Sequence, residues 1–294
     1  MPPLKQGQKG AKICDMKTID THEIYLAVKN MALYANCNVD QGVQSLLKQA
    51  EKTEQNSSAK FALNTILQNN KIASQQSMPA CQDTGMAVVF CEIGQDVCLK
   101  GEFLHDAINR GIKEAYAEGY FRKSVLDPLD RINTKDNLPA IIHTEITTGD
   151  KVKLSFLAKG FGSENMSRLF MLTPSQGIDG IVNAVLQTVR DADSNPCPPI
   201  IVGIGIGGTF EKCALLAKKC LLREVGSQND DPVLARLENE LKEKINSLDI
   251  GVQGFGGNNT CLAVFADKYP THIAGLPVAI NIQCHCARHS SVTI

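Results

Sequence analysis

The spacing of apolar residues changes period near residue 85, and this change constrains the fold more than any other feature of the chain. Before it, three segments repeat apolar residues at every third and fourth position, which is the spacing of one buried helix face. These segments follow Asp20, Asp40 and Ser58, which are expected helix caps. After the change, residues 86–93 form an apolar, β-branched run that is typical of a buried strand.

Strand-like and helix-like segments then alternate to the end of the chain. Further strands are expected at 141–146, 152–156, 200–206, 260–265 and 278–282, and further helices at 104–115, 178–189, 210–222 and 232–245. We therefore predict a mixed α/β fold, with a helical N-terminal segment followed by strands and helices around one functional site. Residues 1–18 are expected to form a disordered tail, and residues 19–294 one domain or two that pack intimately together. The lysines at positions 5, 9 and 12 leave a short organellar leader as the alternative for the tail.

Composition excludes several classes of function. A formal net charge of −1 provides no basic surface for nucleic acid, and the chain has no Trp for base stacking. No apolar run approaches the ~20 residues that a membrane helix needs. Eleven cysteines without a secretory signal indicate a reducing compartment, so we expect a cytoplasmic protein that binds a small molecule.

Three cysteines differ from the rest because they lie in turn-like segments rich in proline, glycine or polar residues. They are Cys81, Cys197 and Cys284. Three thiolates from separate loops suggest a four-iron cluster in which one iron stays open to polarise a substrate oxygen. Zinc is the next alternative, although the chain has no CxxC pair. Cys286 competes with Cys284 for the third position, since one residue separates them.

Several other residues have an ordinary structural explanation when read alone. The remaining cysteines are expected to be small buried hydrophobes: Cys14, Cys37, Cys91, Cys98, Cys213, Cys220 and Cys261. Asp83 stands in an Asp-Thr-Gly turn sequence, and an isolated His272 is usually a packed or surface residue. Gly203, Gly205 and Gly208 satisfy GxGxxG between a strand and a helix, so a nucleotide-binding dehydrogenase is a rival interpretation.

The segments around the three cysteines resemble class I, iron–sulfur-dependent fumarate hydratases and the related tartrate dehydratases. The matching strings occur in the family's order: CQDTGMA at 81–87, KGFGSEN at 159–165, NPCPP at 195–199, GIGIGGT at 203–209 and PTHIA at 270–274. The resemblance extends from about residue 20 to about residue 289.

The resemblance implies a [4Fe-4S] cluster with three cysteine ligands and one open iron. The ligands would be Cys81, Cys197 and Cys284, the catalytic residues Asp83 and His272, and the substrate-binding residues Gln82, Asp83, Arg122 and Gly162. It also implies that Asp83 pairs with His272 to relay a proton. Cys286 departs from the family, in which a small residue such as alanine is expected at this position.

The reaction implied is the reversible hydration of fumarate to (S)-malate, with dehydration of L-tartrate as the alternative. The chain ends just past Cys284 and so resembles the α subunit of two-subunit members. A β subunit would then supply further arginines, a lysine and a catalytic hydroxyl, in a homo- or hetero-oligomer. Residues 19–294 would be the iron–sulfur hydro-lyase domain. A non-catalytic iron–sulfur sensor is the rival from another class.

Overall fold

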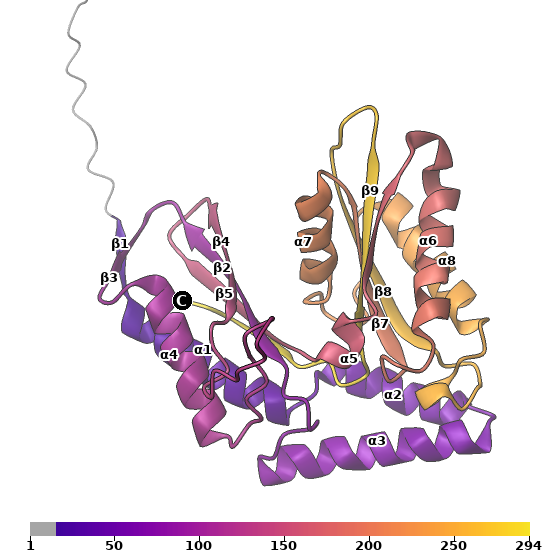
Figure 1. Cartoon of the computed structure of the whole chain (residues 1–294), viewed down its shortest axis with the longest axis horizontal. Helices are drawn as coiled ribbons and strands as arrows, with labels where there is room; N and C mark the ends of the chain where they lie inside the picture. Colours follow the sequence, from indigo (N-terminus) through magenta and orange to yellow (C-terminus); the bar gives the residue numbers. More distant parts are fainter. Residues whose placement is uncertain (1–15) are drawn as a thin grey trace, which may run out of the picture.

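A computed structural model describes residues 16–294 as two lobes above a base of two helices (Figure 1). The helices are α1 (Thr21–Cys37), α2 (Gln41–Thr53), α3 (Ser57–Gln76), α4 (Leu104–Glu118), α5 (Phe161–Glu164), α6 (Gly177–Ala192), α7 (Phe210–Cys220) and α8 (Pro232–Asn246), with 3-10 turns at Pro174–Gln176 and Val252–Gly254. The strands are β1 (Lys17–Asp20), β2 (Met86–Gly94), β3 (Val97–Lys100), β4 (Ile141–Thr147), β5 (Val152–Lys159), β6 (Arg168–Leu172), β7 (Ile200–Gly207), β8 (Cys261–Tyr269), β9 (Leu276–Gln283) and β10 (His289–Thr293). None of the described helices is both long enough and apolar enough to cross a membrane.

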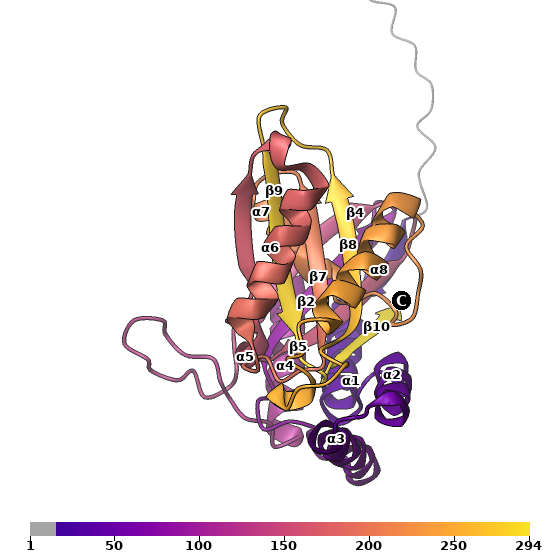
Figure 2. The same cartoon turned by 90° about the vertical axis from the view of Figure 1, so that its right-hand side faces the viewer.

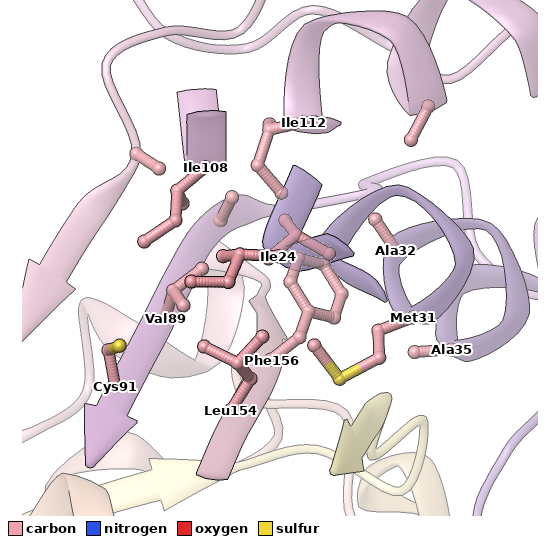
Figure 3. Packing of buried hydrophobic residues seen from close by; sticks show 14 of the residues in the cluster. Ile24, Met31, Ala32, Ala35, Val89, Cys91, Ile108, Ile112, Leu154 and Phe156 are labelled. Atoms are coloured by element: carbon pink, nitrogen blue, oxygen red, sulfur yellow. The ribbon is translucent and has the colours of Figure 1, made fainter. Parts of the chain in front are cut away.

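The first lobe is built on the four-stranded sheet β10-β5-β2-β4, and β1 pairs with β3 as a separate two-stranded sheet. β2 is parallel to β4 and antiparallel to β5, which is in turn antiparallel to β10. Helices α1 and α4 pack against each other, and α1 packs on β5. Ile24 and Ile108 from these helices share one core with Val89 and Phe156 from the sheet (Figure 3). Burial of this apolar face holds the lobe together.

The second lobe is built on the sheet β6-β9-β7-β8, with α7 on one face and α6 and α8 on the other (Figures 1 and 2). Helix α7 approaches β7 unusually closely. A Cβ atom on Gly203 would lie 2.1 Å from the carbonyl oxygen of Ala217, and one on Gly205 would lie 2.0 Å from that of Cys213. Glycine is needed at both positions because any side chain would collide with the backbone of the helix.

Helices α2 and α3 form the base and share a core with the second lobe. Leu47 and Leu63 from the two helices pack in the same cluster as Ala80 and Cys286. Ala80 precedes Cys81, and Cys286 follows Cys284 by two residues. The base therefore fixes two of the cysteine-bearing segments against the underside of the lobes.

The predicted fold class is confirmed, and the longer predicted helices and strands are present. Asp20 and Asp40 cap α1 and α2, accepting hydrogen bonds from the amides of His22 and Val43. The cap predicted for the third helix is wrong. Asn56 caps α3 instead of Ser58, because its side chain accepts from the backbone amides of the next turn.

Four short strands were not predicted: β1, β3, β6 and β10. Each has only four or five residues, too few for a period to stand out from the surrounding sequence. The tail predicted for 1–18 lies mostly outside the described residues. Its last part, Lys17 and Thr18, belongs to β1 and pairs with Val97 and Cys98.

Candidate metal centre

The three predicted cysteines lie on three different connections. Cys81 lies between α3 and β2, Cys197 between α6 and β7, and Cys284 directly after β9. Burial raises the pKa of the Cys284 thiol, and partial desolvation raises that of the more exposed Cys197 thiol; the proximity of Cys81 raises both further. Cys81 therefore lies near both of the other thiols, although the three come from positions far apart in the sequence.

The backbone turns sharply at the most exposed of these cysteines. Cys197 has a φ of 55°, and its amide donates to the carbonyl of Ser194 at 3.0 Å. The Cys197 side chain is exposed, whereas those of Cys81 and Cys284 are half-buried. The turn thus presents the thiol outward from its loop.

Cys286 differs from Cys284 in its surroundings. It is 3% exposed and packs inside the core that the base shares with the second lobe, and burial raises the pKa of its thiol to about 12. Cys284 is less buried, and its Sγ lies 3.8 Å from the backbone oxygen of Cys286.

The prediction that the other cysteines are buried hydrophobes is confirmed for most of them. Those that are buried are Cys37, Cys91, Cys213, Cys220 and Cys261. Cys98 is half-buried, and Cys14 lies outside the described residues.

Asp83 joins two of the predicted motifs. Its Oδ1 accepts a hydrogen bond of 2.9 Å from the amide of Gly85, which is the turn expected from Asp-Thr-Gly. Its Oδ2 accepts a second bond of 2.8 Å from the amide of Phe161, at the start of α5. Two backbone amides thus fix the orientation of the carboxylate. The turn interpretation and a role in the site are therefore compatible.

A cavity of about 570 Å³ opens beside Asp83. Its lining includes Arg122, Arg131, Phe161 and Asn165. This volume is within the usual range for a small-molecule site. Two arginines facing one cavity suit a ligand with two carboxylates, and Arg131 was not identified from the sequence.

The two arginines are carried by the long connection between α4 and β4, which projects from the body of the molecule in Figure 2. This connection is tied to the Asp83 turn at two points. Thr84 Oγ1 donates to the carbonyl of Arg122 at 3.0 Å, and Asn137 Nδ2 donates to the carbonyl of Gly85 at 3.2 Å.

Gln82 and Gly162 lie on the segments that border the cysteines. Gln82 is exposed between Cys81 and Asp83. Gly162 lies in α5, and a Cβ atom there would stand 3.6 Å from the carbonyl of Asn195. Helix α5 thus lies against the loop that carries Cys197.

His272 lies away from this group, so the fold of one chain does not bring it to Asp83. His272 is exposed in the β8–β9 connection, where the neighbouring Thr271 Oγ1 donates to the carbonyl of Gly208 at 2.9 Å. Cys284 follows the opposite end of β9. A strand of 8 residues spans about 26 Å at about 3.3 Å per residue. Figure 1 shows the connection at the top of the lobe and α5 at its base.

Sequence reasoning missed Arg288, which is 1% exposed. Its carbonyl accepts from the amide of Ala158 at 3.0 Å, which fixes the backbone to β5, and its Nη1 donates to Asn36 Oδ1 at 3.3 Å. Burial opposes its charge, but the neighbouring thiols of Cys286 and Cys284 raise its pKa overall. One arginine after the last strand run carries no periodic signal, so the sequence offered no means of finding it.

The Arg288 contact continues into a buried polar network behind the Cys81 loop. Tyr116 Oη donates to the carbonyl of Thr84 at 2.7 Å, and burial raises the pKa of Tyr116 to about 12. The carbonyl of Asn36 accepts from the amide of Ala80 at 2.9 Å. These buried hydrogen bonds fix the position of residues 80–85, which carry Cys81 and Asp83.

Lys159 fixes α5 against the strand that leads to Cys284. Its side chain is 1% exposed, and its Nζ donates to the carbonyl of Ile282 at 2.9 Å. The same Nζ lies 3.0 Å from Ser163 Oγ and 3.0 Å from Glu164 Oε2. Glu164 also pairs with Lys218 on α7.

The donor set fits an iron–sulfur cluster better than a single ion. Within residues 16–294, no three His, Cys, Asp or Glu side chains are grouped closely enough to hold one metal ion, so the zinc alternative has no ready site there. Soft thiols on three loops, of which Cys81 and Cys284 lie near the buried Arg288, would suit a larger anionic group.

The GxGxxG motif, which suggested a nucleotide-binding dehydrogenase, has a structural explanation. Gly203 and Gly205, the first two glycines of the motif, are required by the packing of α7 on β7 described above. The motif therefore carries no independent indication of a nucleotide.

Comparison with known proteins agrees with this arrangement. The family model described as fumarate hydratase (fumerase) matches residues 26–293. The chain is 45% identical over 255 residues to a protein of Methanocaldococcus jannaschii described as "Putative L(+)-tartrate dehydratase subunit alpha", covering 84% of this chain and 89% of the relative. It is 30% identical over 271 residues to the L(+)-tartrate dehydratase subunit alpha of Escherichia coli strain K12, covering 91% of this chain and 89% of the relative.

Proposed function

The chain belongs to the iron–sulfur hydro-lyase family, as an α subunit, and from this premise we propose that it is the cluster-binding subunit of an L(+)-tartrate dehydratase. The observation that carries the choice is that relatives at 45% and 30% identity are both described as tartrate dehydratase α subunits. Fumarate, the first expectation from the sequence, becomes the second candidate. It is kept because the matching family model is described as fumarate hydratase.

The cluster would be held by Cys81, Cys197 and Cys284. When bound, it would supply an open iron that polarises a hydroxyl of the substrate and makes it a better leaving group. Cys284 is preferred over Cys286 as the third ligand because its side chain is less buried.

The remaining residues of the site would bind and orient a dicarboxylate. Arg122 and Arg131 would each meet a carboxylate, which neutralises the charge that builds up when the neighbouring carbon loses its proton. Asp83 is oriented by two amides at the same cavity, so its carboxylate would accept or pass on that proton. Gln82 and Gly162 would contact the substrate from the segments beside Cys81 and Cys197. No role is assigned to His272 within one chain.

A β subunit would complete the enzyme, as the α-subunit relatives suggest. Loss of water from tartrate leaves an enol that becomes oxaloacetate, so the product is distinct from that of fumarate hydration. The test is to reconstitute the α–β pair anaerobically and to assay oxaloacetate formation from L(+)-tartrate beside malate formation from fumarate.

Each outcome has a separate meaning. Oxaloacetate formation that requires both subunits supports the proposal, and turnover of fumarate alone replaces it with the second candidate. A cluster without turnover of either substrate would favour the non-catalytic sensor. No cluster at all would overturn the family's chemistry for this chain.

A further inference from the structure

Arg288 is a buried cation without a carboxylate partner. Its side chain is 1% exposed, and its Nε makes no hydrogen bond. In the part of the chain that the structure describes, it forms no ion pair with an Asp or Glu. Among the described side chains, the one polar group that it contacts at hydrogen-bond distance is the neutral amide of Asn36, at 3.3 Å. A charge buried in this way is strongly unfavourable unless an anion lies nearby.

The surroundings of Arg288 indicate where that anion would be. The thiols of Cys81, Cys284 and Cys286 are close enough to influence the guanidinium. On another side, Arg288 Nη2 lies 3.4 Å from the point that a Cβ atom on Gly160 would occupy. Gly160 directly precedes α5. Arg288 therefore lies between the thiols of Cys81 and Cys284 on one side and the start of α5 on the other.

Asp83 does not take the place of this anion. Its Oδ2 lies 3.2 Å from the same point beside Gly160, and none of the ion pairs among residues 16–294 joins it to Arg288. Both of its oxygens already accept backbone amides, from Gly85 and Phe161. Because no described carboxylate forms an ion pair with Arg288, its positive charge is available to the thiolates and to the group that they hold.

We propose that Arg288 is the counter-ion of the iron–sulfur cluster, a positioning residue that sets the reduction potential of the cluster and its retention in the protein. This inference rests on the proposed cluster. Three thiolates outweigh the formal 2+ charge of a resting four-iron core, so the site is negative overall. Adding an electron makes it more negative, and a fixed cation favours that form. Removing the cation lowers the reduction potential.

The test compares R288M, which removes the charge, with R288K, which keeps it, in the chain after reconstitution with iron and sulfide. R236M is the matched control, because Arg236 is an exposed arginine on α8. The potential of each cluster is measured by titration with dithionite and followed by electron paramagnetic resonance. For R288M we expect the reduction potential of the cluster to be more negative than that of the wild type by at least about 59 mV. For a one-electron couple this corresponds to a tenfold change in the redox equilibrium constant. R288K retains most of the wild-type value, and R236M is unchanged.

A second measurement separates a counter-ion from a residue that only fills space. In the cluster-free chain, R288M removes an unpaired buried charge, so its Tm is higher than that of the cluster-free wild type. In the chain that holds the cluster, the Tm of R288M is instead lower than that of the wild type. If R288M retains too little cluster for a potential to be measured, this comparison of Tm values still shows whether Arg288 acts as a counter-ion.

The failures are distinguishable. A potential unchanged in R288M, or a Tm lowered in both the free and the loaded chain, overturns the role of Arg288 alone. A wild-type chain that takes up no iron and sulfide overturns the proposed function itself.

Discussion

Asp83 and Phe161 are joined by a hydrogen bond of 2.8 Å from the backbone amide of Phe161 to Oδ2 of Asp83. The two residues are far apart in the sequence, on the Cys81 loop and on α5, and this bond sets the spacing of the two segments. The carboxylate that is proposed to handle the proton is thus also part of the frame of the site.

Replacing Asp83 with Asn should abolish most turnover and leave the cluster in place. The amide oxygen still caps Gly85, but the amide nitrogen faces the Phe161 N–H as a second donor, and the base is lost. We expect a fall in kcat of roughly 10²- to 10⁴-fold, with iron content near wild type. Asp106, exposed in the first turn of α4, gives the control variant D106N. Near wild-type activity in D83N would remove Asp83 from the mechanism.

The three ligands can be identified by serine substitution. C81S, C197S and C284S should each lose most of the bound iron and the visible absorbance of the cluster, since a thiolate is lost each time. C286S should retain both, because Cys286 packs in an apolar core. Iron and sulfide analysis after anaerobic reconstitution decides. If C286S loses the iron and C284S retains it, then Cys286 is the third ligand instead of Cys284.

Removing the hydroxyl of Tyr116 should destabilise the protein. In Y116F the carbonyl of Thr84 loses a buried hydrogen bond of 2.7 Å, at a cost of about 1–3 kcal/mol in the free energy of unfolding. Tyr34 is 56% exposed, so Y34F is the matched control and should be unchanged. Urea denaturation measures both. Equal stabilities for the two variants would show that the network behind the Cys81 loop contributes little.

Two glycine variants should separate packing from function. G205A forces a Cβ atom to within 2.0 Å of the Cys213 carbonyl, so we expect a marked loss of Tm. At Gly162 the corresponding distance is 3.6 Å, an ordinary contact, so G162A should fold normally. If Gly162 approaches the substrate, G162A raises KM while the cluster stays loaded. An unchanged KM would exclude Gly162 from the substrate site.

The stability contributed by Glu164 should depend on pH. Burial acts to raise the pKa of Glu164, but Lys159 and Lys218 outweigh it, so the folded-state pKa lies below the usual 4.5. A depressed carboxyl pKa stabilises the protein above the unfolded-state value, and the gain is lost as the pH falls through the folded-state value. The stability difference between wild type and E164Q should therefore be constant near neutral pH and shrink below about pH 4.5. Urea unfolding at several pH values tests this. E243Q, at an exposed position of α8, controls for the lost charge.

Much of the fold could be predicted from local patterns. The apolar spacing in α4, α6 and α8 and the apolar runs of β2, β7 and β9 are properties of neighbouring residues, so they are visible without any tertiary contact. The short strands β3 and β10 could not be predicted, because their identity depends on the strands beside them.

The sequence alone determined the helical and strand segments, the sorting of most cysteines into buried and loop positions, and the family. Only the tertiary structure decided which loops meet. It placed Cys81 near Cys197 and near Cys284, put Arg131 in the cavity with Arg122 and buried Arg288 beside the thiols of Cys81 and Cys284. It also separated His272 from Asp83. The reason is physical: periodicity reports the environment of each residue along one element, whereas strand order and strand length determine which ends of distant elements lie together.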